Sequence, residues 1–421
     1  MPGYHRLVVT LVLSVLTCVP AFAVPAASPE SVRAVFFPYR DGRPQQPGIA
    51  PGMTIDRDNW QAAEAVLLPE ILSLIKAGDF RIRVQATTDL PVRTPYLEAS
   101  LAHAQQARLT EAGQVEHYRA GRPFPVLDAA DPQAGLKALW NFRYRDLPQT
   151  LDIRAYVRGI NSAGTIDRSN VGRMRMRFGM HRVGDEHNDP QWQEKGIYMR
   201  ATFRLIAPAD QEGRMRIMTV FDDNSQPQEI LSYNPLNRRI RKSHSNLLAR
   251  MGGGRYDILM EEQPPLYFIG YLHEYEWTYL TERVLLLPGF LQADAVRFGG
   301  KNNWYPEAPW ELRRVVAVES MPKANHPYGR RVFYLDVQTY ALLAVLSYDA
   351  GGQFARLTLN VHGHPDHVPG AQGVRMPVPL GMSWVNVQRE DAAVFTAGAP
   401  RLNGPDSPRR YDLMELLRMG K

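Results

Sequence analysis

The chain has 421 residues, which suits one large domain or two to three ordinary ones. Its 44% hydrophobic content excludes a disordered chain, and 49 Lys+Arg against 43 Asp+Glu leave a net charge of only +6. The basic residues are scattered rather than gathered in a patch, which argues against a nucleic-acid-binding protein. Composition therefore indicates a globular protein without indicating its function.

The first 23 residues have the pattern of a cleavable signal peptide. A short basic start precedes an apolar run over residues 7–19, and a small-x-small pattern ends at Ala23. The run is too short for a membrane-spanning helix, which needs about 20 residues. The single cysteine, Cys18, lies inside it, so cleavage after Ala23 leaves a chain without disulfides. We expect export to the periplasm, with no transmembrane span.

The next two stretches differ in composition. Residues 24–57 are rich in Pro and Gly and predict an extended N-terminal arm, whereas residues 58–146 predict the helical part of the domain. Pro and Gly fix the breaks in the predicted helices. The helices are expected over 58–78 with a break at Pro69, over 95–109 and over 135–142.

From residue 147 to residue 364 the chain reads mostly as antiparallel strands separated by turn signals. The strands are expected over 151–159, 173–183, 197–206, 214–221, 229–233, 273–287, 311–319, 331–336, 341–348 and 354–361. Residues 365–421 are rich in Pro and Gly and predict a C-terminal extension closing with a short helix over 411–419. Helices followed by about ten strands predict an α+β fold.

An apolar strand face is the first candidate site. Residues 173–180 alternate arginine with methionine or phenylalanine, which places the apolar side chains on one face of a strand. Methionine suits surfaces that accommodate varied apolar shapes, although ordinary core packing would give the same pattern. The candidate ligand-binding residues are Met174, Met176, Phe178, Met180, Met199, Phe203, Met215 and Ile217.

A histidine-rich segment is the second candidate site. His362, His364, Asp366 and His367 follow the H-x-H-x-D-H order of zinc hydrolases, in which imidazoles and a carboxylate bind the metal that activates water. The surrounding strands are antiparallel rather than βαβ units, and no histidine follows His367. The alternative is a polar turn without catalytic function.

Other polar groups have weaker claims. The carboxylate pairs 222–223, 261–262 and 274/276 are of a kind usually found in solvated turns or strand faces. The basic stretch Arg238–Lys242 suits an anionic surface, a partner, or a solvated strand edge. The chain has no G-x-S-x-G elbow and no phosphate-binding loop.

Several motifs in order resemble one known family. They are Asp79–Val84 (DFRIRV), Arg122–Val126 (RPFPV), Gly135–Asn141 (GLKALWN), Tyr233–Pro235 with Arg238–Arg241 (YNP and RRIR), Trp310–Val315 (WELRRV) and Arg330–Asp336 (RRVFYLD). The chain thereby resembles the domain of unknown function 1329 family of Gram-negative bacteria, over about residues 50–365. That family is similar in fold to the LolA/LolB-like carriers that sort outer-membrane lipoproteins.

The resemblance implies a curved antiparallel sheet forming a half-open, LolA-like β-barrel, with helices packed over its concave face. It implies no enzymatic activity, no cofactor and no established ligand residues. It implies a hydrophobic small molecule or lipid as ligand, and an outer-membrane protein or efflux-type exporter as partner.

Three hypotheses follow from the sequence. The first is a non-catalytic periplasmic carrier of lipid or lipoprotein acyl chains linked to outer-membrane traffic. The second is a metal-dependent hydrolase centred on the histidine-rich segment. The third is a structural partner of an outer-membrane complex.

Overall fold

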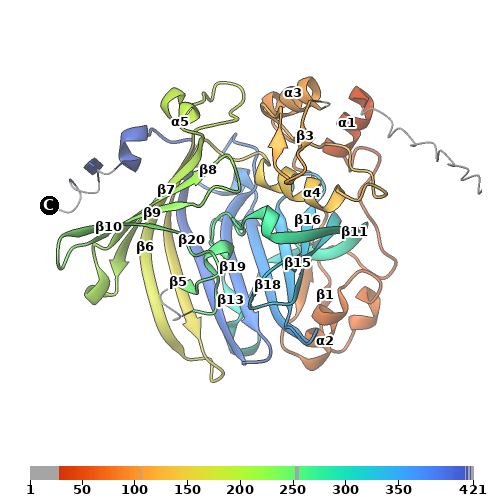
Figure 1. Cartoon of the computed structure of the whole chain (residues 1–421). Coiled ribbons are helices and arrows are strands. Elements are labelled where there is room, and N and C mark those ends of the chain that lie inside the picture. Colours follow the sequence, from red (N-terminus) through yellow and green to blue (C-terminus); the bar gives the residue numbers. More distant parts are fainter. Residues whose placement is uncertain (1–27, 105, 252–255, 413, 416–417, 419–421) are drawn as a thin grey trace, which may run out of the picture.

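A computed structural model describes residues 28–104, 106–251, 256–412, 414–415 and 418 (Figure 1). The expected signal peptide lies outside these residues. Residues 413, 416–417 and 419 of the helix expected over 411–419 also lie outside them. In the described part, short 3-10 turns accompany five α-helices. These are α1 (Pro29–Phe36), α2 (Pro69–Ala77), α3 (Thr94–His103), α4 (Ala134–Arg143) and α5 (Pro190–Glu194).

One 16-stranded sheet, almost entirely antiparallel, dominates the fold. Its main path runs β1 (Thr54–Ile55), β2 (Ile82–Val84), β15 (Pro309–Pro322), β16 (Arg330–Asp336), β17 (Leu342–Tyr348), β18 (Phe354–Gly363), β19 (Val378–Asn386), β20 (Asp391–Leu402), β5 (Thr150–Ile160), β6 (Ile166–Phe178), β7 (Ile197–Ala207), β8 (Met215–Phe221), β9 (Glu229–Asn234) and β10 (Arg239–His244). Off this path, β11 (Tyr275–Pro288) pairs with β15 and β12 (Phe290–Leu291) pairs with β18. Two separate ribbons join β3 (Arg108–Leu109) to β4 (Val115–Glu116) and β13 (Phe298–Gly299) to β14 (Tyr305–Pro306).

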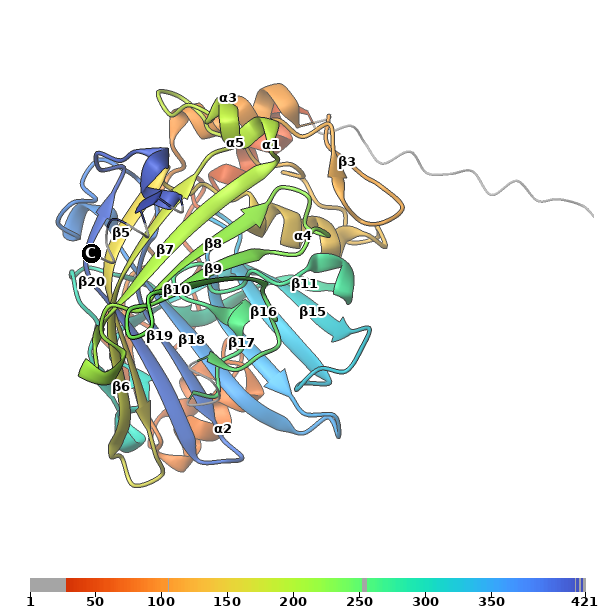
Figure 2. The same cartoon turned by 60° about the vertical axis from the view of Figure 1, so that its left-hand side comes forward.

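The sheet is strongly curved and is not closed in the described residues. Strand β10 pairs only with β9, and β11 pairs only with β15. Figure 2 shows β7–β10 bending away from β15–β18. The fold is therefore mostly sheet with few helices, and it agrees roughly with the expected half-open barrel.

Apolar residues pack on both faces of the sheet. The inner core joins α4 to the concave face through residues such as Trp140, Trp277 and Phe333. The outer core places Ile71 and Ile75 of α2 against the convex face, next to Leu285. Helices thus cover both faces, whereas we expected them over the concave face alone.

Local sequence signals explain where the helices begin and end. Pro69 occupies the first turn of α2, and Gly78 ends it in a left-handed conformation with φ of 82°. The predicted helix over 58–78 is therefore two elements, η1 (Trp60–Ala63) and α2. The N-terminal arm is not wholly extended, because Ser28 caps the short helix α1 through the amide of Ser31.

The C-terminal region differs most from expectation. Residues predicted as an extension contain β19 and β20, which lie in the sheet between β18 and β5. Proline and glycine obscured β19, although Pro379 stands near its start, where a missing amide costs little. Gly381 lies where a Cβ atom would come within 2.4 Å of the Val296 side chain, so the close approach requires glycine.

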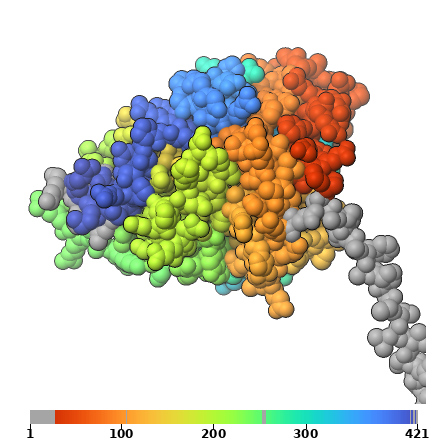
Figure 3. Space-filling view, turned by 90° about the horizontal axis from the view of Figure 1, so that it is seen from above, coloured from red at the N-terminus to blue at the C-terminus, as the bar shows by residue number. Residues whose placement is uncertain are grey.

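One end of the sheet is covered by helices. Figure 1 shows α1, α3 and α5 gathered there, with α2 at the opposite end. Seen from above, the N-terminal segments pack side by side with the α5 region and with C-terminal residues (Figure 3). In the described part, no helix combines the length and the apolar character needed to cross a membrane.

Candidate ligand-binding cavity

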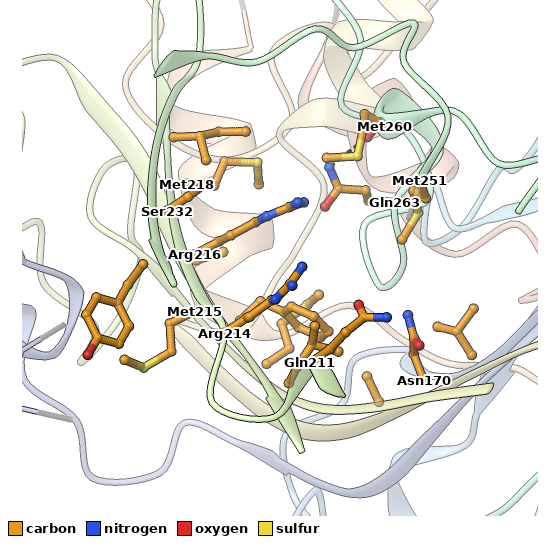
Figure 4. Close-up of a pocket in the computed structure, with 18 of the residues that line it drawn as sticks. Asn170, Gln211, Arg214, Met215, Arg216, Met218, Ser232, Met251, Met260 and Gln263 are labelled. Carbon is orange, nitrogen blue, oxygen red and sulfur yellow. Dashed lines mark hydrogen bonds between the residues drawn. The ribbon is translucent and has the colours of Figure 1, made fainter. Parts of the chain in front are cut away.

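A cavity of about 680 Å³ lies between the concave face of β5–β10 and the crossing segment, residues 247–251 and 256–272 (Figure 4). Its apolar lining comes from both sides. The apolar lining residues are Ala155, Val157, Met174, Met176, Ala201, Phe203, Leu205, Met215, Met218, Ile230 and Ile240 from the sheet, and Met251, Met260, Pro264, Leu266 and Ile269 from the crossing segment. In Figure 4, Met251 and Met260 face the strand that carries Met218.

Strand register explains why these side chains meet. Met176 lies opposite Ala201, Ala201 opposite Met218, and Met218 opposite Ile230. Residues directly opposite in neighbouring strands project on the same side of a sheet. One row of apolar side chains therefore crosses four strands on the concave face.

The predicted apolar residues divide into three groups. Met174, Met176 and Phe203 line the cavity. Three others belong to or pack against the same inner core without lining the cavity, namely Phe178, Met180 and Met199.

Met215 and Ile217 depart from the expected common face. They lie opposite Arg204 and Thr202 and pack with Tyr233 on the convex side, although Met215 also borders the cavity. In Figure 4, Met215 points away from Arg216. The alternation of β8 decides this, because Met218 rather than Ile217 shares the face of Met176.

Other lining residues were missed by the sequence reasoning. Met218 could have been found from the alternation of β8, because it lies two residues from Arg216 and therefore projects from the same face. Met251 and Met260 could not, because they lie in a segment without strand periodicity that the fold brings over the sheet.

Buried ion pairs hold the crossing segment against the sheet. Glu261 accepts hydrogen bonds from Arg331 at 2.6 Å and from the Tyr275 hydroxyl at 2.7 Å. Glu262 pairs with Arg356 of β18. These two carboxylates were expected in a solvated turn or on a solvated strand face, but both are buried, Glu261 fully.

The electrostatics of Glu261 follow from these contacts. Burial alone would raise the pKa of Glu261, but Arg331 and His326 hold it below its ordinary value. Charged carboxylates are buried only when they are paired. The crossing segment is thus fastened by charge as well as by apolar packing.

The polar part of the cavity wall carries positive charge. Arg214 and Arg216 extend from the β8 side into the cavity, towards Gln263 of the crossing segment (Figure 4). Arg239 and Arg241 of β10 also line it. Partial burial and the neighbouring Arg214 lower the pKa of Arg216, although all four arginines keep contact with solvent.

The histidine-rich segment is not assembled into a metal site. His362 is buried against Tyr267, with ring centroids 4.9 Å apart, and burial together with Arg145 lowers its pKa to about 3. His364 Nδ1 accepts a bond from the Asp366 amide at 3.3 Å, while Asp366 and His367 are exposed. Within the described residues, no three His, Cys, Asp or Glu side chains are placed to hold a metal ion.

The remaining polar candidates make contacts within the fold or belong to its strands. Asp222 accepts bonds from His181 at 2.9 Å and from the Tyr144 hydroxyl at 2.7 Å. The basic stretch Arg238–Lys242 falls mainly in β10, which ends the sheet in the part of the chain that the structure describes. It was not among the predicted strands, although a strand edge was one of its interpretations.

Three solved structures show how this chain compares with known folds. A domain from Vibrio parahaemolyticus, described as an outer membrane lipoprotein-sorting protein, is 13% identical, with 68% of this chain and 99% of that chain covered and a TM-score of 0.47. A DUF1329 family protein from Desulfovibrio piger is 15% identical, with 68% and 100% covered and a TM-score of 0.47. A LolA superfamily protein from Nitrosomonas europaea is 9% identical, with 68% and 98% covered and a TM-score of 0.39.

A search of curated proteins gives no match. The family model described as "protein of unknown function (DUF1329)" matches residues 54–402, which is most of the chain. This span includes β19 and β20, which lie beyond the region that the sequence motifs cover. The chain therefore belongs to the DUF1329 family, as its motifs indicated.

Proposed function

We propose that this protein binds a hydrophobic molecule, such as a lipid or the acyl chains of a lipoprotein, and carries it through the periplasm unchanged. The observation that carries this proposal is the methionine-rich cavity between the concave sheet and the crossing segment. The signal-peptide pattern of residues 1–23 supports the compartment.

The cavity suits such a ligand in size and in chemistry. A volume of about 680 Å³ falls within the usual 300–1,000 Å³ of ligand pockets. Methionine side chains adapt to irregular apolar shapes, and each buried methylene group contributes about 0.8 kcal/mol. The described lining includes no Asp, Glu or His, so it offers no carboxylate or imidazole for acid–base catalysis.

The proposal is tested by what the protein carries and by what it takes up. The mature protein, purified from periplasm without detergent, is expected to show a lipid-sized adduct in native mass spectrometry. Stripped of that adduct, it should bind the neutral fluorescent probe N-phenyl-1-naphthylamine with an increase in emission.

Two adjacent residues of β9 provide matched variants. Ile230 lines the cavity, whereas Leu231 packs on the convex face, and both are half-buried. Ile230→Gln should weaken probe binding about tenfold, while Leu231→Gln should leave it within twofold. Equal effects of the two variants, or the absence of both adduct and probe binding, would contradict the proposal.

A further inference from the structure

Four arginines line one side of the cavity wall, two at β8 and two on β10, and β9 lies between these strands. Arg216 of β8 lies opposite Ser232 of β9, and Ser232 lies opposite Arg241 of β10. Arg239 also lines the cavity and lies opposite Asn234, while Arg214 immediately precedes β8. Met218 and Arg216 are two residues apart on β8 and project from the same face. The concave face thus changes from apolar side chains at Met218 and Ile230 to guanidinium groups over two residues of a strand.

These four arginines are exposed to solvent rather than buried in ion pairs. Among the residues that the structure describes, no carboxylate pairs with any of the four, and the cavity lining includes neither Asp nor Glu. The opposite face of the sheet is different. There Arg173 and Arg175 contact Asp152 at 2.6 and 3.2 Å, and Lys242 contacts Glu229 at 2.7 Å.

An unpaired cationic wall restricts what can occupy the cavity. The four guanidinium groups keep contact with solvent, so a ligand that covers them displaces their water, which is costly unless the ligand supplies acceptors. Arginine presents a planar fork of donors that matches the oxygens of phosphate or carboxylate. A neutral or cationic head would leave these donors unpaired.

We propose that the ligand is an anionic lipid, whose phosphate or carboxylate head binds Arg214 and Arg216 while its hydrocarbon chain packs against Met174, Met218 and Ile230. This inference rests on the proposed function and narrows its ligand to one class. Arg239 and Arg241, further out along the same wall, add positive charge where the head enters.

The test compares amphiphiles that share one chain and differ in the head. Dodecyl phosphate, dodecanoate, 1-dodecanol and dodecyltrimethylammonium displace N-phenyl-1-naphthylamine from the stripped full-length mature protein, below their micelle concentrations. The two anions are expected to bind at least tenfold more tightly than the alcohol, and the cation more weakly than the alcohol. Added salt should reduce this preference, because the pairs are partly solvated.

Variants locate the head. Arg214→Gln and Arg216→Gln should each weaken dodecyl phosphate about tenfold and leave 1-dodecanol unchanged. Arg204→Gln is the control, since Arg204 is exposed on the convex face of the neighbouring strand and lies outside the cavity lining.

The outcomes separate this inference from the proposed function. Equal affinities for the four heads, with no effect of Arg214→Gln or Arg216→Gln, would overturn the anionic preference and leave the hydrophobic carrier standing. Inorganic phosphate that displaces the probe at the same concentration as dodecyl phosphate would show an anion site independent of lipid, and would overturn the inference. Failure of all four amphiphiles and of the probe would overturn the proposed function itself.

Discussion

The crossing segment stays on the concave face through Glu261 and Glu262, and Arg331→Met removes one of the charges that hold it. Arg331 contacts Glu261 at 2.6 Å, and both side chains are almost completely buried. Methionine keeps the length of the side chain without its charge. The variant therefore leaves a buried carboxylate that has lost its strongest partner.

The expected cost is large. Removing one partner of a buried ion pair typically lowers the free energy of unfolding by about 3–5 kcal/mol. The remaining partners of Glu261 are Tyr275 and His326, at 2.7 and 3.2 Å. Because they stay in place, we expect the lower part of that range, about 3 kcal/mol.

The cost should also depend on pH. In the native chain the pKa of Glu261 is held below its ordinary value of 4.5, so its stabilising effect is present above pH 4.5 and is lost as the pH falls through the lowered pKa. Without Arg331, burial raises that pKa instead, and protonation then relieves the unpaired charge. The difference between the two proteins should therefore shrink as the pH falls from 7 to 5.

Urea unfolding followed by tryptophan fluorescence measures this difference, and hydrogen exchange reports opening of residues 256–272. The neighbouring Arg330 provides the control, because it pairs with Glu319 at 3.0 Å near the surface. Arg330→Met should cost no more than about 1 kcal/mol. If Arg331→Met unfolds at the same urea concentration as Arg330→Met, with unchanged exchange, the buried pair does not anchor the segment.

Two further predictions test the core around the cavity. In the unfolded chain His362 protonates near pH 6.5, while in the native protein buried His362 stays neutral down to about pH 3. This difference should lower the free energy of unfolding by about 2 kcal/mol between pH 7 and pH 5, and His362→Phe should abolish that pH dependence. Urea midpoints at the two pH values measure this, and an unchanged pH dependence would mean that His362 is solvated. Gly135→Ala should destabilise the protein although alanine normally favours a helix by about 1 kcal/mol, because the new Cβ would lie 2.5 Å from the Trp277 carbonyl oxygen. A rise in the midpoint temperature would show that α4 does not approach β11 so closely.

Much of the sheet could be predicted from local pattern. The alternation around Met174 and Met176 identified the concave side of β6, and Pro69 with Gly78 set the limits of α2. Such signals lie within a few residues of the element that they specify. Strand β19 escaped prediction because Pro379 and Gly381 are tolerated only through its place in the sheet.

The site was less accessible because its partners are distant in sequence. Glu261 meets Arg331 across 70 residues, and Glu262 meets Arg356 across 94. Two adjacent carboxylates look solvated until these partners are known. Likewise, the absence of a carboxylate beside Arg216 among the described residues becomes visible only when β9 and β10 follow β8 in the sheet.

The position of β20 beside β5 has a consequence for how the chain folds. Thr396 pairs with Tyr156, so this contact closes a loop longer than half of the 421 residues. Contacts of such high order slow folding, since loop closure precedes any gain from pairing. Until β20 is synthesised, one edge of β5 stays open to pairing with other chains. A chain truncated before residue 378 would therefore lose the middle of its sheet rather than a tail, and aggregation of the fragment is the expected result.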